Sequence, residues 1–426
     1  MRNKRGIVFV IACIVLSVLL VFSGSLLYKI IYTQNLSKRT EAQIRAFIIA
    51  ESALDFGINL LKNHAITFPY TLSNQSLDEG YFDLVIEKIS PERVKITSTG
   101  KILLSTFGET NQIEKQVQAY LEEESFCRYL YFTTDEHLWG LVPVWFITGD
   151  HLRGPLHTNT HYHISGDPIF DGLAKSHDNW VEYLHGGPPL DNPQFNGGLL
   201  LGVPTIDLPT DASSIKTAAL SGGLYLKGKT LVVFNNDGTL TITNNNKGWY
   251  QKVVSPPSNR VIYIEDGNVY VRGVVKGNFT VGTNKNIIIT DNIVYAEDPR
   301  TTPTSTDMLG LVAEQNVIVS TDDDDGSQIY DQACPYDLEI DASIMALGDS
   351  FVVENWWSCS PLGTLTLFGG VIQKYRGPVG TFDPITNQKL SGYTKDYQYD
   401  ERFESSHPPY FPTTGDWRLL AWEEVE

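Results

Sequence analysis

Three histidines lie within seven residues of one another: His157, His161 and His163. Imidazole nitrogens are common zinc ligands, and His161 and His163 are spaced to share one face of a strand. Asp150 or His151 is close enough in the sequence to supply a further ligand. The alternative is a polar turn in which the imidazoles cap backbone groups. A zinc site and a structural turn both remain open at this stage.

A run of four carboxylates, Asp322, Asp323, Asp324 and Asp325, precedes Gly326. Calcium takes six to eight oxygen ligands, and its best-known loops alternate acidic residues with other types. Four consecutive aspartates do not match that alternation, although an oxygen-rich turn can bind calcium weakly. We therefore expect a solvated loop, with weak calcium binding as the alternative.

Carboxylates that could serve a glycosidase or a polysaccharide lyase are Asp341, Asp349 and Glu354, with Lys374 or Arg376 as a cationic partner. Nothing in their spacing singles out a catalytic pair. The sequence also has no P-loop, no glycine-rich dinucleotide motif after a strand and no G-x-S-x-G motif. We therefore expect no enzymatic activity and no cofactor. Arg376, which precedes Gly-Pro, is expected to hold a turn by pairing with a carboxylate.

The four cysteines are Cys13, Cys127, Cys334 and Cys359, too few for a disulfide scaffold and without zinc-type spacing. Cys334 and Cys359 are 25 residues apart, which is a plausible length for one coil of a β-solenoid. Strands on adjacent coils lie about 4.8 Å apart, within reach of a disulfide. Cys334 and Cys359 are therefore a candidate disulfide, and two buried free thiols remain open as the alternative.

Aromatic residues are concentrated towards the C-terminus. They either cover the end of a β-rich domain, which is the expected role, or form a platform on which sugars stack. The residues are Trp356, Trp357, Tyr393, Tyr397, Tyr399, Tyr410, Phe411, Trp417 and Trp422.

The composition excludes two classes of protein. Of the 426 residues, 42% are hydrophobic and only 19% are charged, which is too apolar for a disordered chain. The net charge of −18 opposes binding to the phosphates of nucleic acid. The 35 glycines and 21 prolines favour turns and strands over a helical bundle.

The N-terminal segment is suited to a membrane. Residues 7–28 carry no charge and would form about 33 Å of helix, enough to cross a bilayer core of roughly 30 Å. Arg2, Lys4 and Arg5 precede the span and favour a cytoplasmic N-terminus. A cleaved signal peptide is the alternative, but its apolar region is usually shorter and followed by a small-residue site. An amphipathic pattern then predicts that the helix continues to Asn63. The residues at three- and four-residue steps are Ile44, Phe47, Ile48, Glu51, Leu54, Ile58 and Leu61.

This N-terminus resembles the type IV pilin-like proteins. The resemblance rests on a basic leader (residues 1–6) that ends in Gly6, the uncharged span and its amphipathic continuation. It implies cleavage between Gly6 and Ile7 by a prepilin peptidase, and packing of the helix against other pilin-like subunits. Residues 46–53 also resemble a run of PilX-like minor pilins, which includes Ala46, Phe47, Ala50 and Glu51. Major pilins have a glutamate at the fifth position after the cut, where this chain has Ile11, so the resemblance favours a minor, tip or priming subunit.

The fold expected for the rest of the chain is α+β. Alternating apolar residues predict a small antiparallel sheet over residues 64–124, with strands at 81–87, 93–100 and 112–121, on the amphipathic half of the helix. The acidic residues Glu122, Glu123 and Glu124 are expected to form a solvated linker. Residues 125–426 are expected to form a right-handed parallel β-helix-like solenoid with an aromatic cap; a sandwich remains open. The strands predicted there are 261–264, 268–271, 274–275, 279–281, 287–289, 311–319, 338–347 and 365–372.

Segments of this second region, among them residues 154–159, 307–313, 373–380 and 392–397, resemble an uncharacterised domain that follows PilX-like N-termini. Together, the resemblances imply a non-enzymatic minor pilin-like component of a type IV pilus or type II secretion-like filament. Its expected partners are pilin-like subunits, prepilin peptidase, membrane lipid and a surface glycan, with the C-terminal domain outside the inner membrane. The alternatives are a membrane-anchored carbohydrate-active enzyme and a plain anchored adhesion protein.

Overall fold

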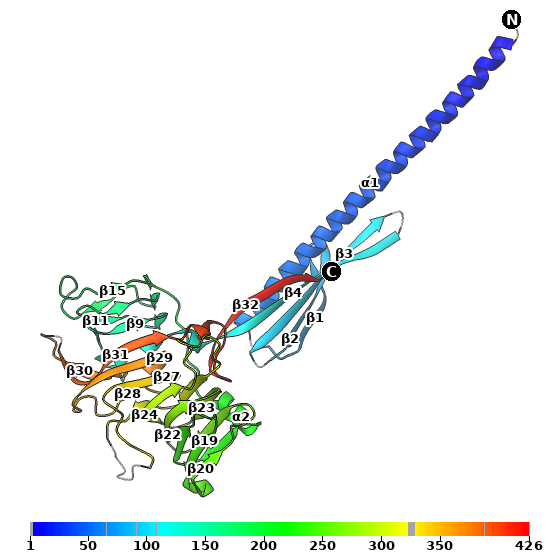
Figure 1. The fold of residues 1–426 in the computed structure, drawn as a ribbon. Helices are drawn as coiled ribbons and strands as arrows, with labels where there is room; N and C mark the ends of the chain where they lie inside the picture. The colour runs from blue at the N-terminus through cyan, green and yellow to red at the C-terminus, as the bar shows by residue number, and fades with distance from the viewer. Residues whose placement is uncertain are drawn as a thin grey trace. The chain divides into compact units, whose positions relative to one another are not determined.

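A computed structural model describes residues 3–64, 66–90, 92–106, 109–322, 329–386 and 388–425, with side chains described from residue 7 (Figure 1). The chain folds into two compact units. The first comprises Met1–Glu124 together with Gly415–Glu426, and the second comprises Ser125–Thr414. The first boundary coincides with the expected one. The expectation that residues 125–426 form one domain was wrong, because the last residues return to the first unit.

The first unit is one long helix and a sheet in the order β1-β2-β3-β4-β32. The strands pair antiparallel, β1 with β2, β2 with β3 and β3 with β4, which confirms the three predicted strands. An additional strand, β1, precedes the three predicted strands. The bounds are α1 (Asn3–Asn63), β1 (Tyr70–Leu77), β2 (Gly80–Lys88), β3 (Arg93–Thr106), β4 (Glu109–Ser125) and β32 (Thr413–Val425).

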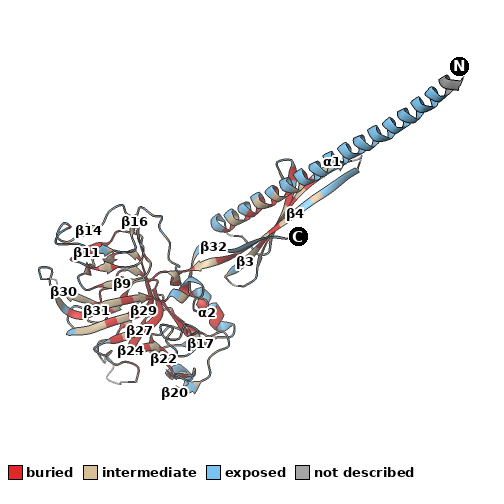
Figure 2. Ribbon diagram, turned by 45° about the horizontal axis from the view of Figure 1, so that its top comes forward, coloured by how far each residue is buried: buried red, intermediate tan, exposed pale blue. Residues whose placement is uncertain are grey.

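The helix packs on this sheet through small residues. Ala46 and Ala50 are fully buried, and Ala42 and Ala53 extend the same stripe at three- and four-residue steps. An added Cβ on Gly100 of β3 would lie 2.0 Å from the Ala46 carbonyl oxygen, so the two backbones come very close. The buried stripe consists mainly of alanines rather than of the larger residues that were predicted, because small side chains let the two backbones approach this closely. Two residues of the predicted stripe, Ile44 and Ile48, are exposed instead. Figure 2 shows that α1 is exposed over most of its length.

The acidic residues Glu122, Glu123 and Glu124 were expected to form a solvated linker. They lie instead at the end of β4. Glu122 is only 7% exposed. Its carboxylate accepts from Arg93 Nε at 2.7 Å and from Arg418 Nη2 at 3.1 Å. These ion pairs connect β3, β4 and β32, and therefore help to hold the last strand in the sheet.

The second unit contains many short strands around a continuous hydrophobic core. Its elements are η1 (Phe126–Arg128), β5 (Tyr131–Asp135), β6 (His137–Leu138), β7 (Val142–Pro143), β8 (Phe146–Ile147), β9 (His151–Arg153), β10 (Leu156–Thr158), β11 (His163–Ser165), β12 (Ile169–Phe170), β13 (Ala174–Ser176), β14 (Glu182–Tyr183), β15 (Gln194–Phe195), β16 (Leu199–Leu201), α2 (Ser213–Leu220), β17 (Leu224–Lys227), β18 (Thr230–Phe234), β19 (Leu240–Asn244), η2 (Asn245–Lys247), β20 (Trp249–Val254), β21 (Val261–Glu265), β22 (Val269–Val275), β23 (Asn278–Thr283), β24 (Ile287–Tyr295), β25 (Met308–Ala313), β26 (Val317–Val319), β27 (Leu338–Ala346), β28 (Phe351–Val353), β29 (Pro361–Tyr375), β30 (Gly380–Phe382), β31 (Lys389–Tyr399) and η3 (Glu401–Glu404). A strand overlaps each of the predicted segments.

Parallel pairing between every second strand dominates this unit. The series β21-β23-β25-β27-β29 forms one row, and β22-β24-β26-β28 forms another. Earlier in the chain, three rows run in parallel: β5-β10-β13-β16, β8-β11-β14 and β9-β12-β15. The chain visits these three rows in the same order on each pass, so residues 18–25 positions apart become neighbours.

The rows from the two ends of the unit meet at one junction. Strand β29 pairs in parallel with β5, and β31 pairs in parallel with β9. The early strands of the unit therefore extend the rows that the late strands begin. The sequence could not predict this junction, since Val371 and its partner Tyr131 are 240 positions apart.

The contact at Gly100 gives a prediction. Gly100→Ala should destabilise the first unit by about 1–3 kcal/mol, because the added methyl overlaps the backbone of α1. Gly24→Ala is the matched control, because an added Cβ there meets nothing within 4 Å. Thermal unfolding and limited proteolysis of the full chain in detergent measure both variants. Equal stability of the two would contradict the close helix–sheet packing.

Candidate functional site

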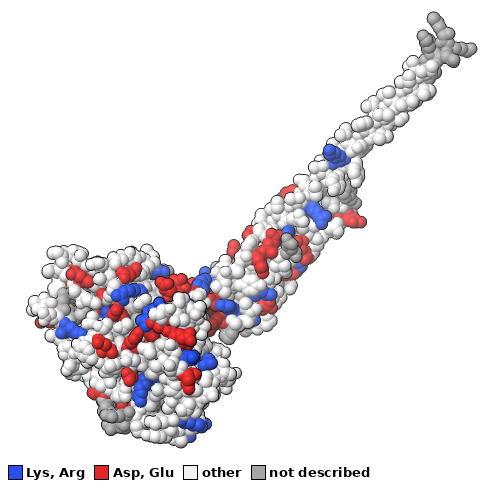
Figure 3. All heavy atoms as spheres, viewed as in Figure 1, with Lys and Arg blue, Asp and Glu red and all other residues white. Residues whose placement is uncertain are grey.

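The N-terminal half of α1 is long and apolar enough to cross a membrane (Figure 3). By length and composition it fits a single-pass anchor or a signal sequence. Gly6 lies near the start of the helix, and the side chains of Ile7 and Ile11 are 59% and 55% exposed. This length of helix has no covering layer among the described residues of the chain, so lipid or other helices would have to provide one.

Of the four residues expected to pack the helix, Ala46 and Ala50 are fully buried on the sheet. Phe47 is partly buried and meets the ring of Trp422 of β32 edge-on at 6.1 Å between centroids. Glu51 is half-buried. Trp422 and Trp417 therefore belong to the first unit, which corrects the expectation that the whole aromatic tail covers the second.

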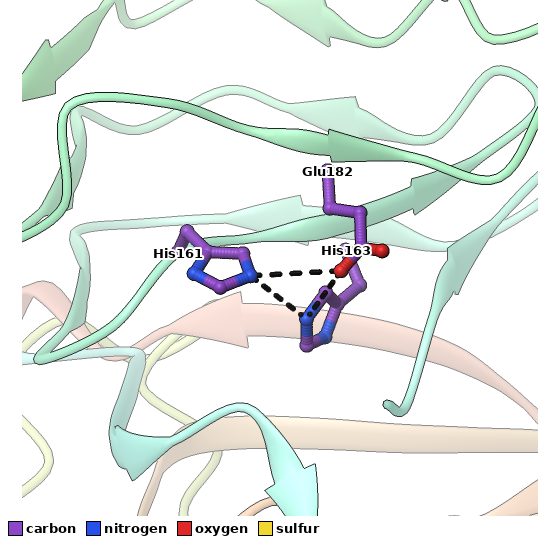
Figure 4. A group of neighbouring side chains, drawn as sticks. All are labelled: His161, His163 and Glu182. Atoms are coloured by element: carbon purple, nitrogen blue, oxygen red, sulfur yellow. Dashed lines mark hydrogen bonds and ion pairs between the residues drawn. The ribbon is translucent and has the colours of Figure 1, made fainter. Parts of the chain in front are cut away.

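Two of the three clustered histidines meet in the second unit (Figure 4). His163 begins β11, and His161 lies in the turn before it. Their Nε2 atoms are 3.2 Å apart. Glu182 of β14, the register partner of His163 in the neighbouring strand, places Oε2 3.2 Å from His163 Nε2 and 3.6 Å from His161 Nε2. Three potential ligand atoms therefore converge at one point.

The environment fixes the orientation and protonation of these rings. His161 Nδ1 is 2.8 Å from Asp178 Oδ2, and the Trp180 ring stacks on the His161 ring at 3.7 Å between centroids. His163 is fully buried, and Trp145 and His137 pack against it. Burial, reinforced by the charge of Arg376, lowers the pKa of His163 to about 3. His163 is therefore neutral at physiological pH.

The other residues proposed for the zinc site have different contacts. His157 stacks on Phe132 at 5.2 Å between centroids, and its Nε2 is 2.9 Å from Asn159 Oδ1. Asp150 Oδ2 accepts from buried Lys395 Nζ at 2.6 Å. His151 Nε2 is 2.6 Å from Asp171 Oδ2. The grouping of His157 with the other two histidines was therefore wrong.

Glu182, Asp178 and Trp180 were missed by the sequence reasoning. The signal that could have found Glu182 is its spacing of 19 residues from His163, which equals one pass through the rows of parallel strands. That spacing has no meaning until the pairing of β11 with β14 is known.

The acidic run is described only in part. Asp323, Asp324 and Asp325 lie outside the described residues. Asp322 accepts from Asn355 Nδ2 at 2.8 Å. The expected calcium alternative therefore stays a prediction.

Cys334 and Cys359 lie before two paired strands, β27 and β29, and line one recess. Both are free thiols, so the candidate disulfide is not formed in this structure. The Cys334 thiol donates to the Ile289 carbonyl at 3.2 Å, and burial raises its pKa. This contact satisfies the sulfur without a partner cysteine.

The three candidate catalytic carboxylates have structural contacts. Asp341 is 1% exposed and accepts from the Tyr295 amide at 2.8 Å. Glu354 accepts from the Thr321 amide at 3.0 Å, and Asp349 accepts from the Ser350 hydroxyl at 3.2 Å. Burial raises the pKa of Asp341 to about 7. Asp341 is too deeply buried to reach a polysaccharide in this conformation.

Arg376 pairs with a carboxylate, as the sequence predicted. The partner is Glu136, whose Oε2 accepts from Arg376 Nη1 at 2.9 Å, and both side chains are buried. The guanidinium also lies 3.5 Å from the centre of the Phe146 ring. Glu136 further accepts from Thr133 and from the Tyr131 hydroxyl.

A recess of about 410 Å³ lies close to this pair. Its lining includes four aromatic side chains, Trp145, Trp356, Phe382 and Tyr393, together with Lys395. Two of these, Trp356 and Tyr393, belong to the predicted aromatic set. Trp357, by contrast, is 63% exposed.

A family model described as a domain of unknown function (DUF4900) matches residues 93–178. The match runs from β3 of the first unit to Asp178 of the second. It includes His161 and His163 and ends before Glu182. No curated protein and no solved structure matches the chain in the corresponding searches.

The raised pKa of Asp341 predicts how stability depends on pH. The folded chain keeps this proton between pH 4 and 7, where the unfolded carboxyl has lost it, so the contribution of Asp341 to stability falls as pH rises through this range. Asp341→Asn removes the titration. The difference in melting temperature between this variant and the unchanged protein (variant minus unchanged) should therefore be larger at pH 8 than at pH 5. Asp349→Asn is the control, and an identical pH profile for both variants would contradict the prediction.

Proposed function

We propose that this protein is a membrane-anchored, minor pilin-like subunit that is processed by a prepilin peptidase and displays its second unit outside the inner membrane. The mechanism is assembly rather than catalysis. Its N-terminal helix is stored in lipid and then moves laterally into the base of a filament, where other pilin-like helices replace the lipid.

The observation that carries this proposal is the continuity of α1. A single helix of 61 residues, about 92 Å long, includes both the uncharged span and the segment that packs on the sheet. A plain anchor needs about 20 residues and tolerates a flexible tether after it. A filament subunit needs a rigid connection, because the position of its helix in the filament must fix the position of its folded unit.

Exposed apolar residues beyond the membrane span also support helix–helix assembly. Ile30, Ile31, Tyr32 and Leu36 continue the apolar surface past residue 28, and Ile44 and Ile48 lie on the face of α1 away from the buried alanines. Water would surround these residues in an isolated anchored protein. Packing against pilin-like helices would bury them.

A second argument concerns the architecture. The antiparallel sheet on the C-terminal half of α1 supports comparison with a pilin headgroup, and the parallel rows of the second unit support a solenoid-like stack. Ile11 replaces the glutamate of major pilins and favours a tip or priming position, where one subunit need not repeat along a shaft.

Processing of the N-terminus tests the proposal. Expression with a prepilin peptidase should yield a chain that begins at Ile7, measured by mass spectrometry of the intact protein. Gly6→Leu should prevent the cut, whereas Gly24→Ala should be processed normally. An intact N-terminus in the unchanged protein beside an active peptidase would overturn the pilin-like assignment and leave a plain anchor.

A glycan-binding role for the displayed unit is favoured by the recess that Trp356 and Tyr393 line, because its volume and aromatic walls suit a sugar ring. The full chain in detergent should bind members of an oligosaccharide array. Trp356→Ala should lower that binding at least about tenfold, the loss expected when one aromatic contact of about 1.4 kcal/mol is removed. Trp357→Ala, on the exposed neighbour, should change it little; an equal effect would place the sugar elsewhere.

A further inference from the structure

We propose that His161, His163 and Glu182 bind a zinc ion. The proposal concerns the second unit alone and does not depend on membrane insertion or on filament assembly.

The spacing of the three ligand atoms matches a tetrahedral centre. Their separations are 3.2, 3.2 and 3.6 Å. Zinc bonds of about 2.0–2.1 Å place tetrahedral ligands about 3.3–3.4 Å apart, whereas an octahedral centre with the same bonds would place neighbouring ligands about 2.8–3.0 Å apart. An ion at the centre would therefore require little movement of the side chains.

The surrounding hydrogen bonds prepare His161 for coordination. Asp178 accepts the Nδ1 proton of His161, which leaves a lone pair on Nε2, the atom that faces His163 and Glu182 (Figure 4). Ligand histidines commonly make this second hydrogen bond to a carboxylate. Trp180, stacked on the ring, restricts its rotation. The ring is thus oriented before any metal arrives.

The ligand types fit a transition metal, and the near-tetrahedral spacing of the ligand atoms favours zinc. Two imidazoles and one carboxylate suit zinc, and three protein ligands leave a fourth tetrahedral position for water or an external ligand. Solvent reaches the cluster because the side chain of Glu182 is 41% exposed. A bound ion would join β11 to β14 and so fasten two successive passes of the chain.

Zinc binding to the metal-stripped full chain in detergent tests the proposal. Competition with a chromophoric chelator should reveal one tight site, and Co²⁺ in its place should give the visible absorption of a tetrahedral centre. Zinc should also raise the melting temperature. His161→Gln and Glu182→Gln should abolish tight binding. Asp178→Asn should weaken it roughly 10–100-fold, because it removes only the orienting hydrogen bond.

His177→Gln is the matched control, since His177 is an exposed histidine near the same turn whose Nδ1 lies 2.8 Å from the Val203 carbonyl. It should bind zinc like the unchanged protein. The Gln variants must retain the circular dichroism of the folded chain. Glu182→Gln, at a partly exposed position, provides the test if His161→Gln misfolds. Absence of a tight site in the folded unchanged protein, or equal binding by all variants, would show that the cluster is only a hydrogen-bonded network.

Discussion

The buried ion pair between Arg376 and Glu136 lies at the junction on which the second unit depends. Arg376 follows β29 and Glu136 follows β5, the two strands through which late and early parts of the unit join. A charge with neither water nor a partner is costly in such a place, so each residue requires the other. Glu136 also accepts from Tyr131 and Thr133, which fixes the turn after β5. The junction is therefore specified by charge as well as by apolar packing.

The first unit depends on a different constraint, the absence of side-chain bulk. Alanine stripes on α1 and Gly100 on β3 let two backbones approach closely, which anchors the helix firmly to the sheet. The same helix exposes large apolar side chains along its other half. The packed half therefore fixes α1 to its own sheet, and the exposed half is the part that other helices would cover in the proposed filament.

Features that depend on residues close together in the sequence could be predicted from it. The uncharged span, the three antiparallel strands of the first unit and, in the second unit, strands β21 to β27 and β29 follow from hydropathy and period. Arg376 was assigned a carboxylate partner because it precedes Gly-Pro, where such a pair can hold a turn. Long-range register could not be predicted in this way. It places Glu182 beside His163, separates His157 from the cluster, joins β29 to β5 and returns β32 to the first sheet. The free thiols of Cys334 and Cys359 show that neighbouring strands alone do not make a disulfide.

The return of β32 makes the second unit an insertion between two strands of the first. Two covalent connections, after Glu124 and before Gly415, therefore link the units where a terminal appendage would have one. A tensile load on the second unit would be divided between them, because each connection continues directly into a strand of the first sheet, β4 or β32. A single break in either connection would therefore leave the second unit joined to the first through the other.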